Sequence, residues 1–260
     1  MKRFALLSLT IGLLCAVPSA QNYLTIQGEV AEKLLRQSRN TLGGEGAVMS
    51  VTSLVMKGVS RVSAGDDGPP ERAVEIRFLF PDQYLRIETA GGWVKRTGFS
   101  GNTLLTEIRN GATIDKPPAQ AATPLLRAEK GRLARMLLGV ASLSTPDVWL
   151  TLRQPPGAVE VGSAFETGST TNSTGFRILE ASAKDGFAAR IFYDASGMPL
   201  RVEYEANRRK ISIAFGDRRK IGALMLPHTI TTTLDGMPLE ELKLSEIAVN
   251  PALSKADFGG

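Results

Sequence analysis

The sequence predicts a mainly β protein of the α+β class, built on an antiparallel sheet with two helical segments. From residue 51 onward apolar residues alternate with others, as in residues 71 to 82 (ERAVEIRFLFPD), and this period of two is typical of half-buried strands. Asn-Gly, Asp-Gly and similar pairs recur between such runs, and they suit the positive backbone angles of tight hairpins. Neighbouring strands are therefore expected to pair in chain order.

The helical segments differ from the strands in their spacing. Residues 28 to 42 (GEVAEKLLRQSRNTL) place Val30, Ala31, Leu34, Leu35 and Leu42 near a helical period, and Gly43-Gly44 follows as a stop signal. Residues 123 to 141 open with Thr123-Pro124, which suits a helix start, and carry an apolar stripe that includes Leu133 and Leu137. One helix is expected before the sheet and one inside the strand series.

Length and composition favour one domain over residues 21 to 260. The chain has 260 residues, of which 43% are apolar and 22% charged, as in ordinary globular proteins. A single all-β domain commonly has this size. No sequence repeat of fixed period is present, so a propeller or solenoid is not indicated.

The first 20 residues (MKRFALLSLTIGLLCAVPSA) have the layout of a secretory signal, with Lys2 and Arg3, an apolar stretch, and small residues at Ser19 and Ala20. The apolar stretch is shorter than the ~20 residues of a spanning helix, so cleavage near Ala20 is favoured over an uncleaved membrane anchor. Cys15, the one cysteine, lies in this segment. The mature chain is therefore expected to have no disulfide and no thiolate nucleophile.

The charge of the chain argues against nucleic acid as a partner. Loss of Lys2 and Arg3 with the signal lowers the formal net charge from +5 to +3. The basic residues are scattered, apart from residues 208 to 210 and 218 to 220. We interpret these two runs as the solvated ends of a hairpin, with residues 218 to 220 in an exposed turn. An anionic membrane surface or an acidic partner is the alternative partner for this mildly basic chain.

No set of residues in the sequence predicts catalysis, a cofactor or a metal site. His228 is the one histidine, and it begins a threonine-rich run with strand alternation, which explains it as a residue at the start of a strand. No Gly-x-Ser-x-Gly motif supplies a nucleophile for it. Glu240 and Glu241 are adjacent, so on a strand their side chains point to opposite faces and do not form a pair of metal ligands. We expect a protein that is not an enzyme.

The C-terminal stretch carries a resemblance to a known family. It comprises a strand beginning after Leu226-Pro227-His228, a turn at Asp235-Gly236, a strand to Val249, then Asn250-Pro251 and a closing Phe258. With the export signal and the order of helices and strands, it resembles the superfamily of periplasmic lipoprotein carriers, most of all their uncharacterised exported relatives. The resemblance implies a large curved antiparallel sheet that forms an unclosed half-barrel, covered by the N-terminal helix and by a lid helix in the middle of the chain.

The same resemblance implies a function in the periplasm. In the family, the apolar space between sheet and helices receives acyl chains, so we expect a monomer that binds or carries a lipid or the acyl group of a lipoprotein. Its predicted lining is apolar: Phe78, Phe80, Leu85, Ile87, Trp93, and Leu133 and Leu137 of the lid helix. Two alternatives stay open at this stage, a fully packed core without a cavity, and a domain that senses or scaffolds envelope components without carrying a ligand.

Overall fold

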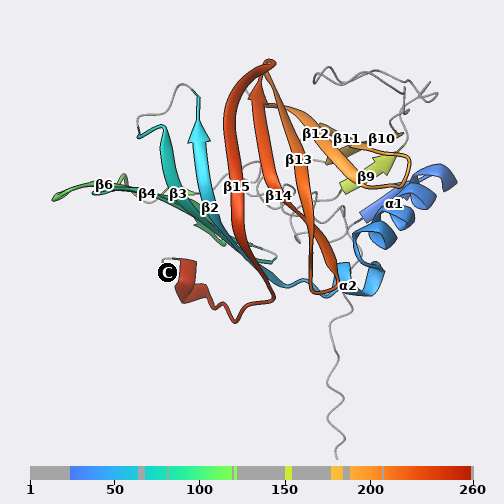
Figure 1. Ribbon diagram of the computed structural model, residues 1–260, viewed down its shortest axis with the longest axis horizontal. Helices are drawn as coiled ribbons and strands as arrows, with labels where there is room; N and C mark the ends of the chain where they lie inside the picture. Colours follow the sequence, from blue (N-terminus) through green and yellow to red (C-terminus); the bar gives the residue numbers. More distant parts are fainter. Residues whose placement is uncertain are drawn as a thin grey trace, which may run out of the picture.

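The protein is described by a computed structural model over residues 24–63, 68–80, 82–118, 120–121, 150–153, 177–183, 188–206 and 208–258. These residues form one sheet of 15 strands (Figure 1), together with two α-helices and a short 3-10 helix. The helices are α1 (Glu29–Leu42), α2 (Glu45–Met49) and η1 (Lys255–Phe258). The strands are β1 (Leu24–Gln27), β2 (Ser53–Val62), β3 (Glu71–Leu79), β4 (Gln83–Ala90), β5 (Trp93–Ser100), β6 (Thr103–Asn110), β7 (Thr113–Asp115), β8 (Gln120–Ala121), β9 (Leu150–Arg153), β10 (Arg177–Ala183), β11 (Ala188–Tyr193), β12 (Pro199–Ala206), β13 (Arg209–Ile221), β14 (Leu224–Leu234) and β15 (Met237–Val249).

The sheet is open and almost entirely antiparallel. Its strands follow the order β1-β9-β10-β11-β12-β13-β14-β15-β2-β3-β4-β5-β6-β7, with β8 beside β6. Among the described strands, β1 and β9 are the one parallel pair. Strands β9 and β6, which lie next to the two ends of this path, are at opposite sides of the curved sheet (Figure 1). The predicted mainly β fold with an unclosed antiparallel half-barrel is confirmed. The predicted signal over residues 1 to 20 and the predicted lid helix over residues 123 to 141 lie outside the described residues.

Helix α1 covers one end of the sheet, as the N-terminal pattern predicts. It buries Ala31, Leu34, Leu35 and Leu42, whereas Val30, which we expected on the apolar stripe, is 57% exposed. The helix ends at Gly43, whose φ of 131° suits glycine. A Cβ atom there would lie 2.0 Å from the carbonyl oxygen of Ala223, in the β13–β14 turn. Gly43 therefore lets the end of α1 lie directly against this hairpin.

The main core lies between α1 and one face of the sheet, which we call the inner face. Leu34 and Leu35 belong to the same cluster of buried residues as Leu226 and Ile230 of β14. A hydrogen bond holds the C-terminal part of the helix: Thr41 Oγ1 donates to the carbonyl oxygen of Ser196, in the turn between β11 and β12, at 2.8 Å. The helix is thus placed over the β11–β14 half of the inner face.

The opposite, outer face has a cover of its own over β4 and β5. After β15 the chain runs to η1, where Phe258 is fully buried beside Leu85 of β4. Arg77 of β3 donates from Nη1 to the carbonyl oxygen of Asp257 at 3.1 Å. This short C-terminal segment therefore closes a second, smaller apolar layer.

In the C-terminal hairpin the turn lies where it was predicted, but the first strand begins earlier than predicted. Asp235 and Gly236 have φ of 50° and 83°, as a tight hairpin turn requires. Strand β14, however, begins at Leu224, before Pro227. Pro227 is tolerated inside the strand because pairing with β15 begins only at Thr229, so on that side no ladder bond is lost.

One basic run lies where the sequence did not place it. We expected residues 218 to 220 in an exposed turn, but they belong to β13, which runs on to Ile221. Arg218 is half-buried, donates to the carbonyl oxygen of Pro199, and has its guanidinium 6.0 Å from the ring of Phe215. Burial lowers the pKa of its guanidinium to about 10, although Asp194 acts in the opposite direction. The runs 208 to 210 and 218 to 220 therefore lie toward opposite ends of one strand and do not form a single basic patch.

Replacement of Asn250 by alanine is expected to lower the free energy of unfolding by about 1–3 kcal/mol. Its φ of 53° is one that asparagine adopts more readily than most residues. Its Oδ1 accepts from the backbone N–H of Thr52 at 2.7 Å, and its Nδ2 donates to the carbonyl oxygen of Ser50 at 3.0 Å. Urea denaturation measures the loss. Asn250→Asp, which keeps the acceptor and loses the donor, should lie between wild type and alanine, and equal stability of all three proteins would refute the assignment.

Candidate functional site

Four aromatic rings gather at one end of the inner face, over β3, β4 and β5. The register places Phe78 opposite Tyr84, and Tyr84 opposite Phe99. Ring centroids are 5.0 Å apart for Phe78 and Tyr84, 5.8 Å for Tyr84 and Phe99, and 5.9 Å for Phe78 and Phe80. Phe80 is half-buried, and the other three rings are buried. We call these four residues the aromatic cluster.

Charged side chains occupy the other end of the same strands on the same face. Arg86 donates from Nη2 to Glu88 Oε1 at 2.9 Å and to Ser60 Oγ at 3.4 Å. The same guanidinium forms a two-point contact with the carboxylate of Glu240, in which Nη1 lies 3.3 Å from Oε2. Ser60 Oγ also donates to Glu240. With Arg72, these residues form what we call the ionic cluster.

Arg72 is the innermost member of the ionic cluster. Its Nη1 lies 3.4 Å from Glu88 Oε1, and its Nε donates to the carbonyl oxygen of Pro69 at 3.0 Å. Its guanidinium also lies 4.8 Å from the ring centroid of Trp93, a distance at which the cation is attracted to the ring face. Trp93 is thereby placed at the charged end of the face.

The electrostatics of Arg86 keep it charged. Burial by itself lowers the pKa of this guanidinium, but the charge and hydrogen bonds of Glu240, together with Tyr84 and Glu88, outweigh burial and hold the pKa above its ordinary value. Because arginine is already protonated at any physiological pH, the ionic cluster does not act as a proton donor or acceptor through Arg86.

The structure brings together only some of the predicted lining residues. Phe78 and Phe80 lie in the aromatic cluster, and Trp93 lies on the same face at its charged end. Leu85 and Ile87 lie on the outer face, because they are opposite Arg77 and Glu75, which alternate with the inward Phe78 and Ile76. Leu133 and Leu137 lie outside the described residues.

Sequence reasoning missed the ionic cluster. The sequence pattern of β4 predicts Leu85 and Ile87 on the inner face. In the structure Tyr84, Arg86 and Glu88 lie there instead. The one available signal was the matching pattern in β3, where Arg72 alternates in phase with Val74 and Ile76 and so lies on their face. Glu240 and Glu241 point to opposite faces, as predicted. Glu240 pairs with Arg86 in the ionic cluster, and Glu241 pairs with Lys243 in solvent.

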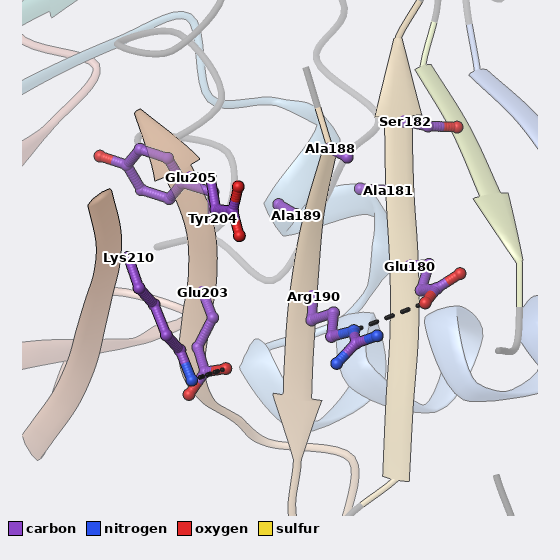
Figure 2. A pocket seen from close by; sticks show the side chains of 10 residues that line it. All are labelled: Glu180, Ala181, Ser182, Ala188, Ala189, Arg190, Glu203, Tyr204, Glu205 and Lys210. Atoms are coloured by element: carbon purple, nitrogen blue, oxygen red, sulfur yellow. Dashed lines mark ion pairs between the residues drawn. The ribbon is translucent and has the colours of Figure 1, made fainter. Parts of the chain in front are cut away.

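A hollow of about 630 Å³ lies among β10, β11, β12 and β13 (Figure 2). Its walls carry ion pairs, with Arg190 Nε 3.5 Å from Glu180 Oε1 and Lys210 Nζ 3.0 Å from Glu203 Oε2. Small side chains lie between them in Figure 2, among them Ala181, and Tyr204 completes this part of the lining. Such a surface suits water and polar groups, and it offers little area to an apolar chain.

His228 is buried on the inner face of β14, where it follows Leu224 and Leu226 in the alternation of the strand. Its Nδ1 lies 3.3 Å from the carbonyl oxygen of Leu226. This contact and the position in β14 agree with the prediction that His228 is an ordinary strand residue. Over the described ranges, no group of three or more His, Cys, Asp or Glu side chains is arranged to hold a metal ion.

Solved structures with the same fold include a LolA superfamily protein from Nitrosomonas europaea. It is 13% identical, with a TM-score of 0.53, and the match covers 88% of this chain and 96% of that one. The chain shares the fold of this superfamily. A DUF1329 family protein from Desulfovibrio piger is 12% identical, with a TM-score of 0.50, 88% of this chain and 96% of that one being covered. A domain of an outer membrane lipoprotein-sorting protein from Vibrio parahaemolyticus is 13% identical, with 88% and 97% covered and a TM-score of 0.49.

Sequence comparisons gave no match to any protein-family model or curated protein. The solved structures confirm the predicted resemblance to the lipoprotein-carrier superfamily at the level of the fold. No helix in the described part of the chain is long and apolar enough to cross a membrane.

Proposed function

We propose that this chain is an exported, non-enzymatic protein that binds or carries a lipid or the acyl group of a lipoprotein in the cell envelope. The aromatic cluster on the inner face of the open sheet carries the proposal. The shared fold and the predicted signal support it. The proposed partners are a lipid or an acylated protein presented at a membrane surface or by another envelope protein, and the proposed state is a monomer in the periplasm.

The aromatic cluster suits an acyl chain because it is apolar and lies away from the helix that packs on this face. The main contacts of α1 with the sheet are made to β1, β14 and the β11–β12 turn, whereas the cluster lies over β3, β4 and β5. Each methylene group moved from water into contact with these rings contributes about 0.8 kcal/mol. A long acyl chain therefore gains enough to bind without any charged contact.

We propose Phe78 and Phe80 as lining residues of this site, with Trp93 at its far end. The roles of Leu133 and Leu137 stay predictions from the sequence. Leu85 and Ile87 serve instead as reference positions, since they lie on the outer face.

Titration of a fluorescent fatty acid into the mature protein tests the proposal, with Phe80→Ser as the variant and Ile87→Ser as its matched control. Both positions are half-buried; Phe80 lies in the aromatic cluster just after β3, and Ile87 lies on the outer face of β4 opposite Glu75. Loss of one phenyl group from the contact corresponds to about 1.5–3 kcal/mol, so Phe80→Ser should weaken binding by roughly 10- to 100-fold. Ile87→Ser should stay within about twofold of wild type.

Absence of saturable binding by the wild type, over a range of acyl chain lengths, would overturn the carrier function. The remaining function would then be that of a domain that senses or scaffolds envelope components with the same fold. Equal weakening by both variants would show that the aromatic cluster is not the site.

The variant His228→Ala is expected to bind the acyl probe with unchanged affinity. The ring contacts the Leu226 carbonyl on β14, away from the aromatic cluster on β3 to β5. Because the side chain is buried, the free energy of unfolding should fall by about 1–3 kcal/mol. Thermal unfolding and the same titration measure the two effects. Loss of binding in a protein that keeps its fold would assign His228 a functional role.

A further inference from the structure

A small hollow lies on the outer face, on the opposite side of the sheet from the aromatic and ionic clusters. Its volume is about 70 Å³, and residues of β4, β5, β6 and η1 line it. Leu85 of β4 and Phe258 of η1 are buried and form its inner wall, whereas Leu105 of β6 is half-buried. We call it the outer hollow, and its apolar surface is supplied mainly by Leu105.

Three charged side chains also line the outer hollow, namely Arg96, Glu107 and Lys116. The register places Arg96 of β5 opposite Ile87 of β4 and Glu107 of β6, and so on the outer face. Lys116 follows β7 directly and is exposed. The aliphatic stems of such long side chains add apolar surface while their charged ends stay near water. The lining therefore has two cations and one carboxylate around an apolar wall.

The carboxylate of the lining has a partner of its own, whereas the two cations do not. Glu107 Oε1 lies 3.7 Å from Nη2 of Arg109, two residues further along β6. Within the described ranges, neither Arg96 nor Lys116 takes part in a hydrogen bond or an ion pair. Two cationic groups at the outer hollow are thus available to an anion.

Carboxylates of the neighbouring elements do not supply that anion. Those on or near the outer face are engaged elsewhere: Glu75 with Arg77, Asp82 with Gln83, and Asp257 with Ser254. Asp115 precedes Lys116 in the sequence, but its register opposite Ile108 places it on the inner face. A bound carboxylate would therefore be the first anionic partner of Arg96 and Lys116.

We propose that the outer hollow binds a short aliphatic carboxylate, with the carboxylate at Arg96 and Lys116 and the chain against Leu105. This inference does not depend on the proposed function. A guanidinium group binds a carboxylate through two parallel N–H···O bonds, which are stronger than bonds between neutral groups. Since a water molecule takes up about 30 Å³ in the liquid, the volume of the hollow admits only a few heavy atoms, and this limits the chain to a few carbons.

Three probes with one chain length test the charge of the ligand: butyrate, butyramide and butylammonium. Each is titrated into the wild-type mature protein and followed by the backbone amide shifts of its NMR spectrum. Butyrate is expected to bind at least about tenfold more tightly than butyramide, and butylammonium more weakly than either. The largest shifts are expected at residues 105 to 107 and at Phe258. Equal affinity for butyrate and butyramide, or no shift at these residues, would overturn the proposal.

A series of acids tests the size of the site. From acetate to butyrate the affinity should rise by up to about fourfold per methylene group, and from butyrate to octanoate it should rise no further, because the hollow is then filled. A steady rise up to octanoate, with shifts at the aromatic cluster in place of the outer hollow, would contradict a site for short chains. Neither this series nor the three probes requires a variant that folds.

Substitution of Arg96 tests the residue that supplies most of the charge contact. Arg96→Gln should weaken butyrate binding by at least about tenfold and leave butyramide within about twofold of wild type. The matched control is Arg61→Gln, because Arg61 is an exposed arginine of β2 that pairs with Glu71 and does not line the hollow. Arg61→Gln should leave both affinities unchanged. Equal weakening of butyrate and butyramide by Arg96→Gln would contradict the assigned carboxylate contact.

The variant Phe80→Ser separates this site from the proposed acyl site. Phe80 lies in the aromatic cluster on the inner face, so its substitution should leave butyrate binding at the outer hollow unchanged. Loss of butyrate binding in Phe80→Ser would place the short acids at the aromatic cluster and overturn the outer site. Absence of long-chain binding with butyrate binding retained would overturn only the proposed function.

Discussion

Phe258→Ala is expected to lower the free energy of unfolding by about 3–5 kcal/mol, the range for large-to-small changes at fully buried aromatic positions. Phe258 is completely buried although it is only two residues from the end of the sequence. It packs beside Leu85 on the outer face of β4, and without it that apolar layer is opened to water. The loss is measured by urea denaturation followed by circular dichroism.

The control for this prediction is Met237→Ala at the first residue of β15. Met237 is 70% exposed, so its truncation should change the free energy of unfolding by no more than about 0.5 kcal/mol. A similarly small effect at Phe258 would mean that η1 is not docked on β4 and β5.

Glu88→Ala is expected to have an effect of the same size, about 3–5 kcal/mol, for an electrostatic reason. The carboxylate is shared by two guanidinium groups, those of Arg72 and Arg86, and Arg72 is fully buried. Removing one member of a buried ion pair leaves an uncompensated charge, which costs far more than the pair itself contributes. The same denaturation experiment measures the loss.

Two further variants separate this explanation from simple loss of side-chain volume. Arg72→Met/Glu88→Leu removes both charges and should recover stability to within about 1 kcal/mol of wild type. Glu71→Ala removes an exposed partner, that of Arg61, and should cost less than about 1 kcal/mol. No recovery in the double variant would contradict the assignment of the loss to an uncompensated charge.

The parts of the fold that the sequence predicts well depend on local chemistry. Alternation in residues 71 to 79 indicates β3 and the face of Phe78, because the side-chain period of a strand is fixed. The turn at Asp235-Gly236 follows from backbone angles that these residues adopt easily. The end of α1 at Gly43 follows from the same kind of argument.

The inward side of β4 depends on contacts that are remote in the sequence. Leu85 and Ile87 were natural choices for the inner face, since apolar residues are usually buried. The C-terminal residues of η1 cover Leu85 from the outside, so both faces of β4 are buried and the alternation has two solutions. The charges of Arg86 and Glu88 are tolerated inside because Arg72 and Glu240 come from two other strands to pair with them.

The position of Arg218 was missed for a related reason. A basic triplet after Asp217 is typical of an exposed turn, but β13 continues through it to the turn at Gly222. The carbonyl oxygen of Pro199 and the ring of Phe215 make a half-buried place for this arginine. Neither contact leaves a signal in the local sequence.

Mass spectrometry of lipid extracted from the protein, purified from the envelope of the cells that produce it, tests the proposed function most directly. An acyl lipid is expected at close to one molecule per chain, retained by Ile87→Ser and largely lost from Phe80→Ser. A wild-type protein that is folded, exported and free of lipid would contradict acyl binding at the aromatic cluster.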